Sequence, residues 1–233
     1  MAVILAGGRG TRLRPYTITI PKPLLPLGDL PILEIVMRRL IASGVSRIVI
    51  ALGHMPQLFM ATIGSGSRWG IQLEYVSEER AMGTAGALQL VKDPQENFLV
   101  MNGDILTTLD FAELFRYHHT ENAYATIALA ERKVEIDYGV IYANDSGDLE
   151  RYVEKPTLSY FVSMGVNVLS RHCLEFIPRD KPFDMPQLMM AMREAGLRVC
   201  CRREICYWKD IGRFEDYEQA SADFAGDASR FLG

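Results

Sequence analysis

The sequence predicts an α/β fold in which helices flank a mostly parallel, mixed sheet. Two patterns support this prediction. Apolar strand-like runs alternate with amphipathic helical stretches through the first half of the chain, whereas strand-like runs follow one another in the second half. With 233 residues, of which 48% are hydrophobic and 23% charged, the chain can bury a full core. We therefore expect one Rossmann-like domain spanning residues 1–233.

The first half is expected to contain βαβ units, because strand-like and helical stretches alternate there. Proline suits the first turn of a helix and glycine suits the position after its last turn, and Pro31 and Gly44 flank one helical pattern in this way. The expected strands are Ala2–Ala6, Arg47–Leu52, Ile71–Val76 and Phe98–Met101, and the expected helices are Ile32–Ala42, Gln57–Ile63 and Thr84–Val91.

The second half is expected to add antiparallel or mixed strands to the sheet, since little helical pattern separates its apolar runs. No internal repeat or linker interrupts it, and the chain ends soon after the last helical pattern, so we expect no appended domain. The expected strands are Tyr124–Ala130, Tyr138–Tyr142, Leu149–Val153 and Val162–Leu169, followed by helices at Met185–Glu194 and Phe214–Phe224.

Charge and cysteine content exclude several classes of function. A formal net charge of -4 argues against a nucleic-acid partner, which a basic surface would normally meet. No apolar run approaches the roughly 20 residues of a membrane-spanning helix, and no secretory cleavage pattern follows Met1, so a cytoplasmic protein is expected. Four cysteines lack CxxC spacing and are expected to be reduced and structural: Cys173, Cys200, Cys201 and Cys206.

A loop of small residues and cations follows the first strand. Successive glycines from Gly7 to Gly10 let backbone N–H groups approach an anion that side chains would keep away. The loop lacks the Gly-Lys-Ser/Thr of a Walker A sequence, and Leu13 replaces the third glycine of GxGxxG. A glycine-rich stretch can also be a simple tight turn. Prolines on both sides of Lys22 stiffen its presentation and favour a phosphate-binding loop with a catalytic lysine.

Two aspartates are candidate metal ligands. Asp104 follows the apolar strand Phe98–Met101, and ligands of open α/β sheets bind beyond the carboxyl ends of the strands. Magnesium prefers one or two carboxylates together with phosphate oxygens, and Asp210 is the candidate for the second carboxylate. Taken singly, each aspartate would more often be a turn or helix-capping residue.

Together these stretches resemble the sugar-1-phosphate nucleotidyltransferase family, whose motifs occur here in the family's order from Ala2 to about Tyr217. The chain is most similar to the short, single-domain mannose- or heptose-1-phosphate guanylyltransferase-like members. The resemblance implies an Mg²⁺-dependent enzyme that joins a nucleoside triphosphate to a sugar 1-phosphate and releases pyrophosphate. It rests on Leu5–Pro15, Pro21–Leu24, Gly83–Leu88, Gly103-Asp104, Glu154-Lys155-Pro156 and Tyr207–Gly212.

The resemblance also implies roles for individual residues. Arg12 and Lys22 would be catalytic, and Asp104 and Asp210 would bind the metal. The chain departs from the family at Ser163–Asn167, where relatives commonly show Asn-Ala-Gly-Ile/Val-Tyr, so only Gly165 carries over there. The implied nucleotide-binding residues are Leu5, Ala6, Gly7, Gly8, Gly10, Thr11, Glu78, Gly83, Thr84 and Asn102, and the implied sugar-phosphate-binding residues are Gly139, Glu154, Lys155 and Gly165.

The preferred base is inferred from Glu78, which stands where uridylyl and thymidylyl members usually have glutamine. A carboxylate can accept hydrogen bonds from both N1–H and the exocyclic amine of guanine, whereas uracil and thymine offer one donor flanked by carbonyls. GTP is therefore favoured, with UTP, dTTP and CTP as alternatives. Glu78 also belongs to the charged run Glu78-Glu79-Arg80, which could be a solvated surface.

Three other functions are weaker alternatives. A non-catalytic regulatory subunit that binds nucleotide sugars would not need Arg12, Lys22, Asp104 and Asp210. A glycosyltransferase would want an Asp-x-Asp sequence, and Asn102-Gly103-Asp104 has only one of the two acids. A dehydrogenase is disfavoured by the incomplete GxGxxG. The sequence leaves the sugar and the oligomeric state open.

Overall fold

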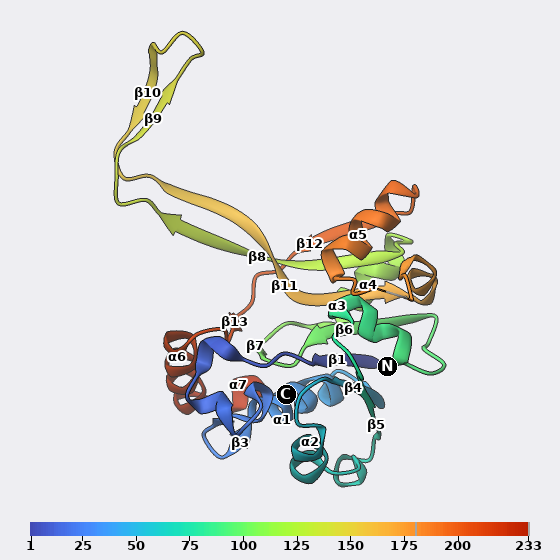
Figure 1. The fold of residues 1–233 in the computed structure, drawn as a ribbon. Coiled ribbons are helices and arrows are strands. Elements are labelled where there is room, and N and C mark those ends of the chain that lie inside the picture. The colour runs from blue at the N-terminus through green and yellow to red at the C-terminus, as the bar shows by residue number, and fades with distance from the viewer. Residues whose placement is uncertain (180, 233) are drawn as a thin grey trace.

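The computed structural model describes residues 1–179 and 181–232. Its centre is a seven-stranded sheet of order β12-β8-β11-β6-β1-β4-β5 (Figure 1). Neighbouring strands run parallel except for β11, which is antiparallel to both β6 and β8. The mixed, mostly parallel sheet confirms the predicted fold class. The strands are β1 (Ala2–Ala6), β4 (Arg47–Leu52), β5 (Gln72–Ser77), β6 (Asn97–Asn102), β8 (Ala125–Glu135), β11 (Thr157–Ser170) and β12 (Val199–Arg203).

Helices cover both faces of this sheet. Ile4 of β1 packs on one face with α1, α2 and α4, whereas Val3 packs on the other with α5. Because β1 is covered on both faces, its sequence is apolar throughout instead of alternating. The helices are α1 (Ile32–Ala42), α2 (Pro56–Ile63), α3 (Gly83–Gly86), α4 (Phe111–Thr120), α5 (Met185–Glu194), α6 (Phe214–Gly226) and α7 (Ser229–Leu232), with short 3₁₀ turns between several elements.

A third apolar cluster joins the two ends of the chain. Leu13, in the loop after β1, is buried together with Ile211 and with Phe224 of α6. The described residues also form three two-stranded ladders, and two of them take part in this cluster, through Leu106 of β7 and Leu27 of β2. The ladders pair β2 (Pro26–Leu27) with β3 (Leu30–Pro31), β7 (Ile105–Thr107) with β13 (Trp208–Asp210), and β9 (Val140–Ala143) with β10 (Leu149–Val153).

Residues 131–162 form a two-stranded arm. Strands β8 and β11 stay paired beyond the sheet as far as Glu135 opposite Thr157, and the β9–β10 hairpin continues outward from there. Figure 1 shows this arm standing clear of the body of the protein. It accounts for the expected strands Tyr138–Tyr142 and Leu149–Val153, the first of which begins two residues later than expected.

Most expected elements are present, although the expected helix Thr84–Val91 is only the short helix α3 followed by a 3₁₀ turn, and several elements, among them α4 and the sheet strand β12, were not expected. The end of α1 matches the expectation for Gly44, which has φ of +88° and donates its N–H to the Ile41 carbonyl at 2.9 Å. Helix α4 falls in a stretch for which the sequence patterns predict no element. Its start is marked by Asp110, whose carboxylate accepts the N–H of Glu113, a capping pattern that the sequence itself contains. Every helix in the described part of the chain is too short or too polar to cross a lipid bilayer.

His118 of α4 makes stability depend on pH. Its ring lies 2.9 Å from the Thr126 hydroxyl and 3.1 Å from Asn97 Oδ1, and the residue is 1% exposed. Burial, and then the neighbouring His119, lowers the pKa of His118 to about 4. In the unfolded chain the imidazole has a pKa near 6.5, so as the pH falls it binds a proton before the folded chain does. The contribution of this residue to the free energy of unfolding is therefore complete above about pH 6.5 and is lost as the pH falls toward 4.

We therefore expect the free energy of unfolding to fall by about 2 kcal/mol between pH 7 and pH 5 because of this residue. His118→Gln keeps hydrogen-bonding capacity without titrating and should flatten the profile. Urea unfolding of both proteins across this range measures the difference. Parallel profiles would show that His118 is not responsible.

Candidate active site

The candidate site lies beyond the carboxyl ends of β1, β4 and β6. The chain places β4 on one side of β1 and β6 on the other, and ligands of open α/β sheets bind at such a switch in strand order. Three adjoining cavities of about 520, 330 and 240 Å³ open there. Leu5 lines all three, Asn102 lines the two larger ones, and Asp104 lines the two smaller ones.

The loop after β1 forms the smallest cavity. Gly10 has φ of +60°, and a Cβ there would lie 3.1 Å from the Cβ of Lys22, so the loop can pack this closely only with glycine. The Thr17 hydroxyl donates to the Gly10 carbonyl at 2.7 Å and holds the turn. Arg12 and Lys22 thus face one cavity, which Leu5, Ala6, Gly8, Gly10, Thr11 and Asp104 also line.

The β7–β13 ladder brings the two candidate metal ligands together. Asp104 immediately precedes β7, and Asp210 ends β13 opposite Ile105. The N–H of Ile211 donates to the backbone carbonyl of Asp104 at 3.1 Å, which continues the ladder. The Lys22 ammonium forms an ion pair with Asp104 Oδ2. The basic turn and both aspartates come from separate stretches of the sequence, and the fold therefore places them next to one another.

The electrostatics at this point favour a bound cation. Loss of surrounding water raises the pKa of Asp210, the Asp104 carboxylate raises it further, and Lys22 and Arg12 oppose them. Asp210 is still exposed, so it can accept an incoming ion. Asp104 Oδ1 is buried without a hydrogen-bond partner among the described residues, which is costly for a carboxylate oxygen. Two carboxylates and one unsatisfied oxygen fit a magnesium ion that takes its remaining ligands from phosphate and water.

Glu78 lines the 330 Å³ cavity with Gly7, Gly83 and Thr84. Its Oε2 accepts the N–H of Met82 at 2.9 Å, and its Oε1 lies 3.1 Å from the position of a Cβ on Gly7. Glu78 is therefore held in a cavity beside the glycine-rich loop and is not part of a solvated charged run.

The loop that starts with Gly83 is fixed by the segment before α5. The Phe183 carbonyl accepts the N–H groups of Ala85 and Gly86 at 3.0 and 2.9 Å. Asp184 Oδ1 accepts the Thr84 N–H at 2.9 Å, and the Thr84 hydroxyl accepts the N–H of Met185 at 2.8 Å. Thr84 therefore links the 330 Å³ cavity to the 520 Å³ cavity.

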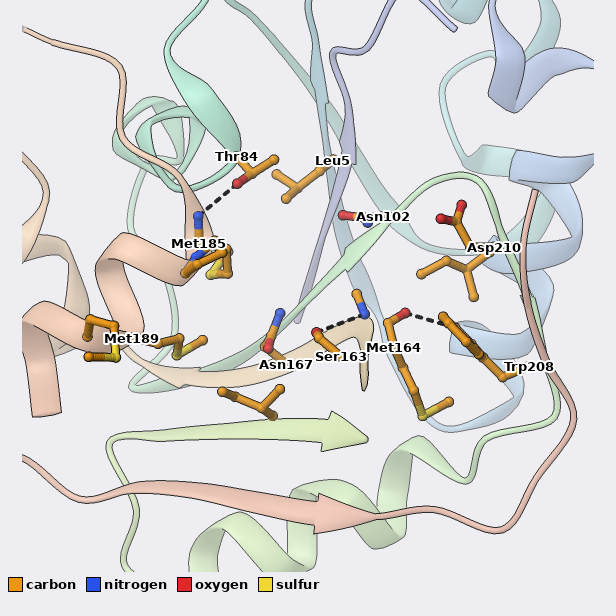
Figure 2. A pocket seen from close by; sticks show the side chains of 15 residues that line it. Leu5, Thr84, Asn102, Ser163, Met164, Asn167, Met185, Met189, Trp208 and Asp210 are labelled. Carbon is orange, nitrogen blue, oxygen red and sulfur yellow. Dashed lines mark hydrogen bonds between the residues drawn. The ribbon is translucent and has the colours of Figure 1, made fainter. Parts of the chain in front are cut away.

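The 520 Å³ cavity, the largest of the three at this site, is mainly apolar (Figure 2). The Trp208 indole N–H donates to the Met164 carbonyl at 2.9 Å and closes one side. Gly165 has φ of +69°, and a Cβ there would lie 2.6 Å from Asn102 Nδ2, so only glycine permits this approach. Of the described residues that line the cavity, Asp210 alone is ionisable. The polar lining otherwise comes from Thr84, Asn102, Ser163 and Asn167.

Three of the expected sugar-phosphate-binding residues do not line any of the three cavities. Gly139, Glu154 and Lys155 lie on the arm, and Gly139 packs against Tyr152, whose hydroxyl would be 2.4 Å from a Cβ at that position. Lys155 precedes Thr157, the far end of the β8–β11 pairing. Strand geometry of about 3.3 Å per residue puts Thr157 roughly 20 Å from Ser163 at the cavity.

Several residues that line the cavities or shape the loop beside them have no place among the sequence expectations. Gly53 follows β4, and a Cβ there would lie 2.6 Å from the Gly7 carbonyl oxygen, so Gly53 fixes how closely the glycine-rich loop approaches the sheet. Asp184 begins α5, and its N–H is accepted by the side chain of Gln187, a capping pattern that the sequence contains. Asn167 carries no signal that separates it from core residues, whereas Trp208 lies in the Tyr207–Gly212 stretch but was given no role of its own.

Comparison with known proteins finds relatives that agree with one another in kind. Residues 1–226 match the nucleotidyl transferase family model. Mannose-1-phosphate guanylyltransferase of Mycobacterium tuberculosis is 31% identical over 95% of this chain and 64% of its own length. UTP–glucose-1-phosphate uridylyltransferase of Synechocystis sp. is 30% identical over 94% of this chain and 62% of its own length. The chain thus spans less than two thirds of these relatives.

A solved structure extends the similarity. HddC from Yersinia pseudotuberculosis superposes with a TM-score of 0.74 at 26% identity, covering 96% of this chain and 98% of that one. HddC has also been crystallised complexed with GMP-PN, and that chain gives a TM-score of 0.73.

Gly53→Ala should weaken nucleotide binding. The added methyl group would clash with a backbone carbonyl oxygen that cannot move away, so the glycine-rich loop must shift. In well-organised sites, a displacement of about 1 Å can lower the reaction rate by up to about 100-fold. We expect the affinity for a nucleoside triphosphate, measured by isothermal titration calorimetry, to fall by about tenfold or more. Gly226→Ala is the control, because a Cβ there meets no atom within 4 Å. Equal affinities for the two variants would exclude this role of Gly53.

Proposed function

Because the chain belongs to the nucleotidyl transferase family, we propose that it joins a nucleoside triphosphate to a sugar 1-phosphate and releases pyrophosphate. One observation carries the proposal. Arg12, the buried Lys22, Asp104 and Asp210 converge beyond the carboxyl end of β1, next to glycines whose backbone can approach an anion. Charge of both signs in one confined cavity suits a triphosphate with a divalent ion.

Phosphoryl-type transfer needs positioning and charge stabilisation more than covalent chemistry from the protein. The backbone from Gly8 to Thr11 would hold the triphosphate, while Lys22 and Arg12 would stabilise the charge that develops at the α-phosphate. Lys22 is 8% exposed, so its charge acts with little screening by water. A sugar phosphate is already anionic at neutral pH, so its oxygen needs no general base before it attacks the α-phosphorus in line with the leaving pyrophosphate.

Asp104 and Asp210 would hold Mg²⁺. Bound there, the ion would neutralise negative charge on the phosphate oxygens. The supporting observations are the unpartnered Asp104 Oδ1 and the pKa of Asp210, which is raised first by loss of surrounding water and then by the Asp104 carboxylate. The sugar would lie in the 520 Å³ cavity, where apolar side chains can pack on the ring and Asn102, Ser163 and Asn167 can bind hydroxyl groups.

GTP is the favoured nucleotide. Glu78 Oε1 is free beside Gly7 while Oε2 is occupied by the Met82 N–H, so a carboxylate oxygen is available to accept from a guanine edge. The similarity to a guanylyltransferase and to HddC, crystallised with GMP-PN, supports this choice. The similarity to a uridylyltransferase keeps UTP as the alternative.

The direct test is a matrix of GTP, UTP, dTTP and CTP against mannose, glucose, heptose and N-acetylglucosamine 1-phosphates, read as pyrophosphate release in the presence of Mg²⁺. We expect turnover with at least one pair, and with GTP more efficiently than with the other nucleotides. Absence of turnover across the matrix, with nucleotide-sugar binding retained, would instead indicate a non-catalytic binding subunit.

Lys22→Ala should lower kcat by at least about 10²–10³, the typical cost of removing one preorganised charge donor. Near-full turnover in a folded Lys22→Ala protein would mean that this lysine is not catalytic. Lys92→Ala is the matched control, since that exposed lysine lines none of the three cavities and should leave kcat unchanged. Circular dichroism and melting temperature separate lost chemistry from lost folding, because Asp104 also loses its partner in Lys22→Ala.

Glu78→Gln should change the preference between bases. A glutamine can donate as well as accept, so it removes a repulsion toward the carbonyls of uracil and weakens the charged hydrogen bonds to guanine. Hydrogen bonds to charged groups contribute about 1.5–3 kcal/mol, so the ratio of kcat/KM for GTP to that for UTP should fall by about 10–100-fold. Glu79→Gln, an exposed neighbour that lines none of the three cavities, should leave the ratio unchanged. An unchanged ratio in Glu78→Gln would separate Glu78 from base recognition.

A further inference from the structure

Asn167 is a buried polar side chain without a partner in the described part of the chain. Eight polar or charged side chains are buried there, and seven of them are hydrogen-bonded or ion-paired to another group of the protein. The seven are Thr17, Lys22, Glu34, Thr107, His118, Thr126 and Ser170. Asn167 is 4% exposed, and its amide forms no hydrogen bond with another described residue. A buried amide without a partner is costly, so its presence needs a physical reason.

The place of Asn167 on β11 is one that the strand pattern assigns to an apolar side chain. Alternate residues of a strand share a face, and Leu169 belongs to the apolar cluster that packs against α5. The two strand partners of Asn167 are Val100, which belongs to the same cluster, and Ile127, which packs against it. An amide therefore stands among aliphatic side chains, where an apolar residue would be less costly to bury.

The amide of Asn167 is directed into the 520 Å³ cavity (Figure 2). The other neutral polar residues of its described lining differ in their surroundings. Thr84 and Ser163 are exposed, and their hydroxyl groups accept backbone N–H groups at 2.8 and 3.2 Å. Asn102 is half-buried, so water can reach it. Among these four side chains, Asn167 is thus the one that combines burial with free hydrogen-bonding capacity toward the cavity.

Asn167 lies deeper in the cavity than the charged groups of the site. It pairs with Val100 of β6, two residues before Asn102 and four before Asp104. At about 3.3 Å per residue, Asn167 is therefore roughly 7 Å further along the sheet than Asn102, away from the candidate metal ligands. The next step rests on the proposed function. If the phosphate lies near the two carboxylates and their metal, the part of a sugar 1-phosphate that reaches Asn167 is an edge of the sugar ring remote from the phosphate.

A carboxamide suits such a sugar edge. It presents one acceptor oxygen and two N–H donors, and a hydroxyl group both donates and accepts hydrogen bonds. Asn167 carries no charge that would favour a phosphate in its place. It also belongs to the stretch Ser163–Asn167, in which the chain departs from the sequence common in the family, so its role is not carried over from relatives.

We propose that Asn167 determines which sugar 1-phosphate this site accepts, because its amide binds a hydroxyl group on the sugar edge that reaches the floor of the 520 Å³ cavity. A substrate with a hydroxyl group at that edge completes the hydrogen bonding of the amide. A deoxy sugar leaves the amide buried and unpaired, and sites built to bind a hydroxyl group discriminate strongly against analogues that lack it. The substrate class is therefore a sugar 1-phosphate that is hydroxylated at this edge.

The first experiment compares wild-type protein with Asn167→Leu on glucose 1-phosphate, mannose 1-phosphate and their monodeoxy derivatives, each lacking one hydroxyl group. Leucine is close to asparagine in shape but forms no hydrogen bonds. In wild type, kcat/KM should fall by about 10–100-fold for one deoxy position. In Asn167→Leu, kcat/KM for the parent sugar should fall by a similar factor, and removing that hydroxyl group should have no further effect. The proposal is overturned if every deoxy derivative loses the same factor in both proteins.

Met189→Leu is the matched control. Met189 of α5 lines the same cavity, and the change replaces one apolar side chain with another. The ratios of kcat/KM between the parent sugars and their deoxy derivatives should equal those of wild type. A change in these ratios as large as that in Asn167→Leu would show that the shape of the cavity selects the sugar, and would overturn the role of the amide.

The melting temperature gives a readout that needs no turnover. Without ligand, Asn167→Leu should melt at or above the temperature of wild type, because an apolar side chain replaces an unpaired buried amide. A melting temperature several degrees lower in Asn167→Leu would show that the amide has a structural partner, such as a buried water molecule. That result would overturn the proposal.

Calorimetric titration separates this proposal from the proposed function. If no pair of nucleotide and sugar 1-phosphate shows turnover, binding of the same sugar phosphates and deoxy derivatives is measured in place of kcat/KM. The expected pattern in binding would support Asn167 and refute the transferase activity. Turnover with the same deoxy losses in Asn167→Leu as in wild type would refute the role of Asn167 and leave the activity standing. Absence of both turnover and sugar-phosphate binding at millimolar concentration would refute both.

Discussion

The short antiparallel ladder between β7 and β13 is the constraint on which the rest of the site depends. It places Asp210 opposite Ile105, one residue from Asp104, although the two acids are far apart in the sequence. Loss of surrounding water raises the pKa of Asp210, and the Asp104 carboxylate, which repels the charge on Asp210, raises it further. Backbone hydrogen bonds, including Ile211 N–H to the Asp104 carbonyl at 3.1 Å, and the burial of Leu106 and Ile211 in one apolar cluster oppose this repulsion. The fold therefore holds in place a pair of carboxylates that would otherwise separate.

The glycine-rich loop is preorganised by close packing more than by its own hydrogen bonds. Gly7 lies against Gly53 at the end of β4, and Gly10 lies against Lys22, in both cases at distances that a Cβ would not allow. Small residues at these positions keep backbone N–H groups accessible and present Lys22 from a buried segment. Less reorganisation is then needed when charge develops on a bound phosphate, which is the usual source of electrostatic catalysis. The same packing makes the loop sensitive to substitutions at Gly53, a residue that need not touch the ligand.

The proposed nucleotide and sugar sides of the site differ in charge. The proposed nucleotide side combines the loop after β1, Glu78 and the Thr84–Asp184 contact, all on the body of the protein. The proposed sugar side has apolar walls and, apart from Asp210, neutral polar groups, whereas Arg12 and Lys22 line the neighbouring cavity. An extension of just two strands, β8 and β11, thus separates residues that lie close in sequence: Gly165 lines the cavity while Lys155 lies far out on the ribbon.

The sequence alone determined the layer structure and singled out the residues that are proposed to bind the nucleotide. Local periodicity defined β1, α1 and β4, because burial on one face or both leaves a pattern in neighbouring residues. Motifs singled out Lys22, Asp104 and Asp210 as functional, but their meeting depends on the β7–β13 pairing, which joins segments with no local signal of each other. The contact of Gly53 with Gly7 and the outward course of the arm were likewise decided by tertiary structure. Both depend on which strands become neighbours, and that follows from packing of the whole chain and not from the composition of any one segment.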